Sequence, residues 1–250
     1  MDILTDLLRF FIFYTGVFFL LIVFRYFLAA GIFYYYYYIK NKQRHLSKKL
    51  SKRKPKNRQI KNEIKWSIIS SAIFAVAGTL IYYMYEQGLT GIYISVGLSD
   101  IFYIPFSLLL ILLIHETYYY WIHRWMHLPA IYKYVHKVHH DSLTPTPWTA
   151  FSFHPWEALI MAIIIPAVLI FLPVHLYVIM FYLILMTISS VVNHLDIEIY
   201  PRKFRNSIIG QQFIGATHHH FHHSEFNTNY GLYFTFWDRW LKTESKQMPQ

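Results

Sequence analysis

Long apolar stretches alternate with short polar ones along the chain, on the length scale of a lipid bilayer. The first apolar stretch, residues 10–39, is interrupted by Arg25, and five consecutive tyrosines, residues 34–38, stand just before its end. The second, residues 66–85, holds twenty uncharged residues, the number that a helix needs to cross the hydrocarbon core. Because tyrosine rings favour the headgroup region, we expect one tilted span from the first stretch and another span from the second.

Two further apolar stretches follow. Residues 101–114 continue without a break toward the first histidines, so a helix here would carry them out of the membrane. Residues 158–192 are broken by Pro166 and Pro173, and proline interrupts the helical hydrogen-bond ladder. This pattern predicts a helical hairpin whose arms are short for full spans, and whether it crosses the bilayer or re-enters stays open. We expect an all-α polytopic membrane protein with about four to five membrane-embedded helices.

Composition agrees with a membrane protein and narrows its class. Hydrophobic residues make up 55% of the 250 residues and charged residues only 14%, far from a soluble average. The formal net charge of +10 comes from residues 40–65, where twelve Lys/Arg and one acid give +11 and leave −1 for the remaining chain. One basic loop is not the general anion-binding surface typical of nucleic-acid proteins, so no nucleic-acid partner is expected.

The same basic loop orients the chain in the membrane. Cytoplasmic loops carry an excess of Lys and Arg, so residues 40–65 are expected to face the cytoplasm. The second span then leads outward and the third returns, which brings the histidines after it to the cytoplasmic side. A hairpin at 158–192 would return the end of the chain to that side as well. We therefore expect residues 1–100 to form a membrane anchor region, and residues 101–245 to form a domain with a cytoplasmic helical cap.

The candidate chemistry lies in three histidine-rich segments, HRWMH, HKVHH and HHHFHH. They contain His123 and His127; His136, His139 and His140; and His218, His219, His220, His222 and His223. Residues spaced i, i+3 and i+4 share one face of a helix, so each segment is expected to aim its imidazoles in one direction. The pattern HxxHH is expected about 0.05 times by chance at this histidine content, yet it occurs twice.

A metal site explains this pattern. The chain has no cysteine, so any metal must be bound through nitrogen or oxygen, and thiolate haem and cysteine-ligated iron–sulfur clusters are excluded. Imidazole suits iron, zinc, copper and nickel, and one ion accepts about four to six ligands. Nine or ten histidines therefore indicate two ions. His194, at the boundary between membrane and cytoplasm, is a candidate additional ligand.

Further motifs accompany the histidines. With PTPW and FHPWE after HKVHH, and NTNYGLYFTFWDRW after the last histidine segment, the chain resembles the fatty acid hydroxylase/sterol desaturase superfamily, and its sterol C5-desaturase branch most of all. The resemblance covers about residues 115–240 and implies that the 101–245 domain is catalytic. It also implies two iron ions held by His123, His127, His136, His139, His140, His194, His218, His219, His222 and His223. Glu116 stands where the family often has Asp, and His220 has no clear counterpart.

The resemblance implies a reaction as well. O2 is activated as a co-substrate at the reduced iron pair and hydrogen is taken from an unactivated C–H bond, which gives an alcohol or an alkene. A site at the membrane surface favours a lipid-like substrate such as a sterol or a fatty acyl chain. Electrons are implied to come from an external donor such as cytochrome b5 or a ferredoxin. The bacterial inner membrane and the endoplasmic reticulum membrane are the two expected locations.

Carboxylates are expected to support the ligands. An acidic side chain often accepts the second N–H of a ligating imidazole and so fixes the orientation of the ring. Five candidates for this role are Glu116, Asp141, Glu157, Asp196 and Glu225.

A non-enzymatic alternative uses the same histidines. A polytopic zinc-binding or metal-transport protein would also need polar or charged residues within its spans to form an ion path. The apolar stretches offer almost none, so the sequence favours the enzyme.

Overall fold

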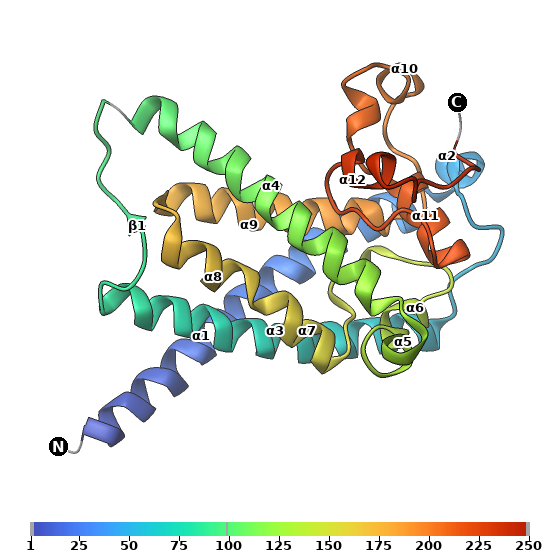
Figure 1. The fold of residues 1–250 in the computed structure, drawn as a ribbon. Helices are drawn as coiled ribbons and strands as arrows, with labels where there is room; N and C mark the ends of the chain where they lie inside the picture. Colours follow the sequence, from blue (N-terminus) through green and yellow to red (C-terminus); the bar gives the residue numbers. More distant parts are fainter. Residues whose placement is uncertain (1–2, 99, 249–250) are drawn as a thin grey trace.

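The computed structural model describes residues 3–98 and 100–248. Along the chain the elements are α1 (Ile3–Tyr34), the π-helix η1 (Tyr35–Lys40), α2 (Lys42–His45), η2 (Leu46–Lys48), α3 (Asn57–Glu86), β1 (Ile92–Tyr93), α4 (Asp100–Met126), α5 (Pro129–Val135), α6 (Lys137–His140), η3 (Pro147–Phe151), α7 (Pro155–Ala162), α8 (Ile164–Phe171), β2 (Val174–His175), α9 (Leu176–Asn193), α10 (Arg202–Arg205), η4 (Gly210–Gln212), α11 (Ala216–Glu225) and α12 (Phe236–Trp240). The long helices form a bundle, and most of the short ones gather at one end of it (Figure 1).

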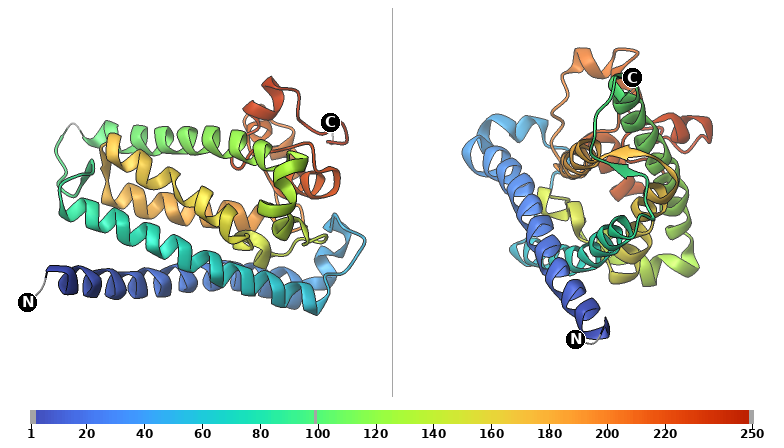
Figure 2. Two further views of the ribbon diagram at one scale, coloured as in Figure 1. Left: turned by 60° about the horizontal axis from the view of Figure 1, so that its bottom comes forward. Right: turned by 90° about the vertical axis from the view of Figure 1, so that its left-hand side faces the viewer.

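Within residues 3–98 and 100–248, four helical segments are long and apolar enough to cross a membrane. They are Ile3–Lys40, Asn57–Glu86, Asp100–Met126 and Leu176–Asn193, and they run side by side (Figure 2). Large apolar side chains such as Phe24 of α1 and Phe102 of α4 are exposed on them, which suits contact with lipid hydrocarbon. The expected all-α membrane fold with several embedded helices is confirmed.

The hairpin predicted at 158–192 is present, and proline explains its first break. α7 ends at Ala162, and α8 follows after one residue. Pro166 has no N–H to donate to the carbonyl of Ala162, four residues earlier, so the regular ladder stops there. The apolar stretch Pro155–Phe171 is shorter than the four candidate spans, whereas α9 is one of them. The two arms of the hairpin are therefore unequal.

A short parallel strand pair lies at the end of the bundle opposite the histidine segments (Figure 1). Ile92 of β1 pairs with Val174 of β2, and Tyr93 pairs with His175. The ring of His175 also accepts a hydrogen bond from the N–H of Tyr177 and caps α9. These contacts tie the connection between α3 and α4 to the turn of the hairpin.

The two N-terminal spans contact the segment that follows the histidines of HKVHH. Tyr26 of α1 and Ser67 of α3 are fully buried, and both donate to the carbonyl oxygen of Trp148, at 2.8 Å and 3.2 Å. Since Trp148 belongs to η3, α1 and α3 position the turn that follows HKVHH. The division into an anchor region at 1–100 and a catalytic domain at 101–245 stays a prediction.

The basic loop, residues 40–65, lies at the same end of the bundle as the histidine segments (Figure 1). The Nζ of Lys49 lies 3.7 Å from the carboxylate of Asp196. Ser51 donates to the same carboxylate through its N–H at 3.0 Å and through its hydroxyl at 2.8 Å. The loop and the C-terminal part therefore form one polar end, whichever side of the membrane it faces.

Candidate metal centre

Among the residues that the structure describes, nine buried or half-buried histidines come together in two groups at this polar end. Within each group the ring nitrogens that could bind a metal all lie within 4.8 Å of one another. The five-histidine group contains His123, His127, His136, His140 and His222. The four-histidine group contains His139, His194, His219 and His223. The two groups adjoin, because the ring centroids of His140 and His223 are 4.5 Å apart.

Different elements deliver the two groups. The five-histidine group draws on the end of α4, the α5–α6 segment and α11, whereas the four-histidine group draws on α6, α11 and the residue after α9. His194 is that residue, and its N–H still donates to the carbonyl of Ser190 in the last turn of α9. The fourth span therefore carries one ligand candidate to the polar end, and the third span carries two.

The expectation that each histidine segment aims in one direction is wrong for HKVHH and HHHFHH. His136 and His140 join the five-histidine group, but His139 points into the four-histidine group. In the last segment His219 and His223 stay together, while His222 joins the other group. Consecutive helical residues differ in direction by about 100°, so neighbouring histidines reach two adjacent centres. Each of these segments serves both groups.

The nitrogen geometry fits bound cations. His123 and His136 face each other through Nε2 atoms 3.1 Å apart, while their Nδ1 atoms face oxygen acceptors. In the other group the Nε2 atoms of His139 and His194 are also 3.1 Å apart. With the proton on Nδ1, each such pair brings two bare lone pairs together, which is repulsive unless a cation binds both. Metal–nitrogen bonds of about 2.1 Å at right angles place two ligand nitrogens about 3.0 Å apart.

Oxygen acceptors behind the rings fix their orientation. Four rings donate through Nδ1 to a backbone carbonyl oxygen: His123 to Tyr230 at 2.8 Å, His222 to Thr228 at 2.8 Å, His194 to Ser190 at 2.7 Å and His139 to Ser152 at 3.3 Å. The fifth, His136, donates through Nδ1 to the carboxylate of Glu157 at 2.8 Å. Such bonds select the tautomer that presents Nε2 to a metal. Most of these acceptors are backbone groups, which every residue offers, so no sequence signal could have identified them.

Burial also favours the neutral form of the rings. Burial lowers the pKa of His194 to about 4. For His127, burial and then the neighbouring His123 lower the pKa to about 2. The pKa values of His219 and His223 lie well below the ordinary value for the same two kinds of cause. Neutral imidazole is the form that binds metals.

The comparison with protein families agrees with this centre. Residues 108–243 match the model of the fatty acid hydroxylase family, and they include every member of both histidine groups. The chain belongs to the fatty acid hydroxylase family.

Named relatives of this family member are sterol enzymes. It is 31% identical to a Delta(7)-sterol 5(6)-desaturase of Gibberella zeae over 193 residues, 77% of this chain and 58% of the relative. It is 31% identical to the lathosterol oxidase of Homo sapiens over 187 residues, 72% of this chain and 60% of the relative. The chain thus spans about three fifths of the length of these relatives. The expected similarity to the sterol C5-desaturase branch is confirmed. No solved structure matches the chain.

Four of the five carboxylates expected behind ligand rings have other partners. Only Glu157 meets one of the nine grouped histidines. Glu116 accepts hydrogen bonds from three consecutive backbone N–H groups, at residues 232–234, and so attaches the C-terminal segment to α4. Asp141 forms an ion pair with Lys137. Glu225 accepts hydrogen bonds from Thr228 and Ser245. Asp196 accepts from Ser51 and from His220, a histidine that is in neither group. For these four, the expected support of a ligand ring is wrong.

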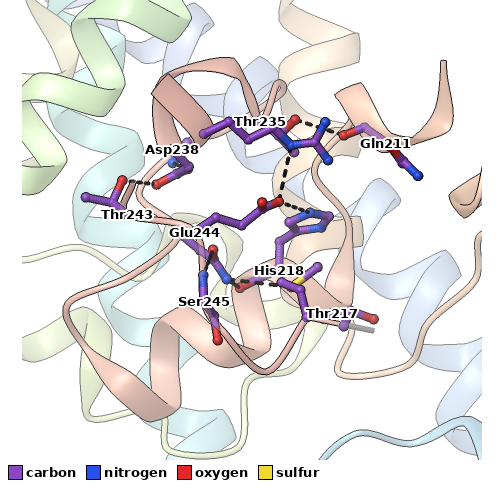
Figure 3. Close-up of polar contacts among 12 residues, drawn as sticks. Gln211, Thr217, His218, Thr235, Asp238, Thr243, Glu244 and Ser245 are labelled. Carbon is purple, nitrogen blue, oxygen red and sulfur yellow. Dashed lines mark hydrogen bonds and ion pairs between the residues drawn. The ribbon is translucent and has the colours of Figure 1, made fainter. Parts of the chain in front are cut away.

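His218 lies outside both groups. Its Nε2 is 3.9 Å from a carboxylate oxygen of Glu244, and Figure 3 shows the two side chains facing each other. Both line a polar cleft of about 460 Å³, together with Arg205 and Arg239. Burial, and then these two arginines, lower the pKa of His218 to about 4. The structure therefore brings together nine of the ten ligands implied by the resemblance.

Proposed function

We propose that this chain is a membrane-bound oxidoreductase that uses two iron ions and O2 to hydroxylate or desaturate an unactivated C–H bond of a sterol-like lipid. The observation that carries the proposal is the pair of adjoining histidine groups whose Nε2 atoms face one another at one end of an apolar helix bundle. The named relatives act on sterols, which favours that class among lipid-like substrates.

The chain's own residues would bind the ions and exclude water. Nine neutral imidazoles would ligate two irons, and the carbonyl and Glu157 acceptors would hold the rings in place. Iron in such a centre supplies the reduction of O2 and the abstraction of hydrogen. His123, His136 and His222 are at most 1% exposed, so bulk water would not reach the ligands, which protects reactive states from side reactions.

Location and electron supply follow from the polar end of the molecule. The basic loop lies at this end, and the positive-inside rule assigns such loops to the cytoplasm. We therefore propose that the metal centre faces the cytoplasm, at a bacterial inner membrane or at the endoplasmic reticulum. An external one-electron donor, such as cytochrome b5 or a ferredoxin, would deliver electrons there.

Metal analysis of the detergent-purified protein tests the proposal. We expect two irons per chain, with O2 consumption that depends on the iron and is faster with a sterol-type substrate. Mass spectrometry of the product then distinguishes hydroxylation, which adds oxygen, from desaturation, which removes two hydrogens. One zinc per chain, without O2 consumption, would favour the zinc-binding or transport alternative and reject the enzyme.

Topology mapping tests the shared side of the ligands. Tags placed near residues 130 and 220 should both be accessible from the cytoplasm. Tags found on opposite sides would exclude a single centre, because HKVHH and HHHFHH contribute to both groups.

A further inference from the structure

A continuous row of oxidisable rings joins the five-histidine group to the protein surface. Tyr230 contacts His123, His127 and His222 with ring centroids 5.7, 5.4 and 5.7 Å apart. Tyr120 lies 6.0 Å from Tyr230, Trp237 lies 5.8 Å from Tyr120, and Trp240 lies 5.6 Å from Trp237. We call Tyr230, Tyr120, Trp237 and Trp240 the aromatic chain.

The aromatic chain begins in the core and ends in solvent or at the membrane interface. Tyr120 is fully buried and Tyr230 is 6% exposed, but Trp240 is 69% exposed. Trp237 also contacts Trp121, with centroids 5.7 Å apart, and Trp121 is 47% exposed. The ring of Phe153, which contacts His139 of the four-histidine group, is much harder to oxidise than phenol or indole.

Tyr120 has a built-in path for its proton. A tyrosine gives up an electron readily only if its hydroxyl proton leaves at the same time. The hydroxyl of Tyr120 lies 2.9 Å from Oγ1 of Thr243, and Thr243 donates to the carboxylate of Asp238 at 2.7 Å, the contact drawn in Figure 3. Asp238 also accepts from the N–H groups of Tyr230 and Gly231, which holds it in place. By contrast, the hydroxyl of Tyr132, another ring beside the five-histidine group, has no hydrogen-bond partner in the described part of the chain.

We propose that the aromatic chain is an escape route that carries oxidising equivalents away from the metal centre when O2 is activated without a substrate. This inference rests on the proposed function.

In each event one electron moves from Tyr120 toward the five-histidine group past the ring of Tyr230. The O–H bond of Tyr120 breaks, its proton passes to Thr243, and the hydroxyl proton of Thr243 passes to Asp238. Tyr120 then takes an electron from Trp237 and recovers its proton, and Trp237 is refilled from Trp240 or Trp121. A small-molecule reductant, such as a thiol or ascorbate, restores the surface indole.

Interfacial anchoring is the simpler role for these tryptophans, because indole rings favour the membrane surface. Anchoring requires only the apolar and amphipathic character of the rings and makes no use of the Tyr120–Thr243–Asp238 contacts, which also fasten the C-terminal segment to α4. Oxidation chemistry distinguishes the two roles.

The test is a map of oxidised residues after uncoupled turnover. Iron-loaded protein in detergent is reduced without air, exposed to O2 in repeated cycles with no substrate, digested and analysed by mass spectrometry. We expect several-fold more oxygen addition at Trp240 and Trp121 than at Trp156, a control tryptophan on α7 that is 60% exposed. Freeze-quench electron paramagnetic resonance should detect a neutral tyrosyl radical. Zinc-loaded protein should give neither signal.

Two variants separate the route from general oxidative damage. Tyr120→Phe keeps the ring but removes the phenol, so the excess at Trp240 and Trp121 over Trp156 should disappear together with the radical. Thr243→Val keeps Tyr120 but breaks the relay, and it should lower both signals in the same direction. Metal content should stay at the wild-type value in each variant.

Three results would overturn the route: equal labelling of Trp240 and Trp156 in the wild type, an excess that survives Tyr120→Phe, or labelling centred on Tyr132. A failure of the iron-loaded protein to consume O2 without substrate would overturn this inference alone, whereas a failure to consume O2 even with a sterol-type substrate would overturn the proposed function and this inference with it.

Discussion

The five-histidine group and the four-histidine group share two sequence segments but differ in ligand number and surroundings. HKVHH and HHHFHH contribute to both groups, while His123 and His127 belong only to the first and His194 only to the second. An octahedral ion would keep about one position open in the first group and about two in the second. We infer that the four-histidine group offers more room for O2, and that the five-histidine group, beside Tyr230, is better placed for electron exchange.

Single ligand replacements give the largest expected effects, and they test the difference in ligand number between the two groups. His194→Ala would leave three ligands in its group, so we expect iron content to fall from two ions to about one per chain and O2 consumption to fall more than about 100-fold. His123→Ala would leave four ligands in its group, and we expect more of its iron to remain. Iron per chain by plasma mass spectrometry and O2 uptake check both variants. Equal losses in the two variants would contradict unequal groups.

Acid should destabilise the metal-free protein through the same buried rings. The pKa of His194 is about 4 in the folded protein because of burial, against about 6.5 in an unfolded chain. As pH falls below 6.5, His194 binds a proton in the unfolded chain but stays neutral in the folded protein. The stability contribution is therefore complete above pH 6.5 and is lost toward pH 4, by about 3 kcal/mol for this group.

Melting temperatures of the metal-free protein between pH 7 and pH 5 measure this effect. We expect them to fall with pH, and we expect a shallower fall for His194→Gln, which removes one titrating ring. The iron-loaded protein should melt at a higher temperature throughout this range, because bound metal stabilises the folded state. A melting temperature of the metal-free protein that does not change with pH would contradict the assigned burial effect.

Glu157→Gln should weaken one group only. Its carboxylate accepts from Nδ1 of His136 at 2.8 Å, and His136 belongs to the five-histidine group. Loss of such an acceptor typically costs about 10–100-fold in metal affinity, so we expect one of the two irons to be removed at lower chelator concentration. Asp141→Asn is the matched control, because Asp141 is exposed and pairs with Lys137. Unchanged metal content and turnover would remove Glu157 from the supporting residues.

Sequence patterns predicted the long helices well because apolar length and proline positions decide them. The uncharged stretch at 66–85 lies in α3. The first arm of the hairpin is interrupted after Ala162, because Pro166 has no N–H to donate to the Ala162 carbonyl. The pair β1–β2 was not predicted, because two-residue strands carry no pattern of their own.

The histidines of the metal centre were identifiable from the sequence, but their distribution between two groups was not. The spacing of His136, His139 and His140 predicts a shared helical side, whereas the assignment of each ring depends on what lies opposite it after folding. The same holds for the ring acceptors: the carbonyls of Tyr230 and Ser190 have no sequence signature. Tertiary structure alone decides such contacts.

His218 should show a smaller effect than His219, His222 or His223 of the same segment, although the family resemblance includes it among the ligands. Its Nε2 faces Glu244 at 3.9 Å, and its ring belongs to neither group. We expect His218→Ala to keep two irons per chain and to change O2 consumption by less than about twofold, below the usual cost of losing a supporting contact. His219→Ala, one residue further on, is the comparison and should empty the four-histidine group. If His218→Ala also released iron, the ring would have to turn away from Glu244 when metal binds, and the four-histidine group would then have a fifth ligand and equal its neighbour.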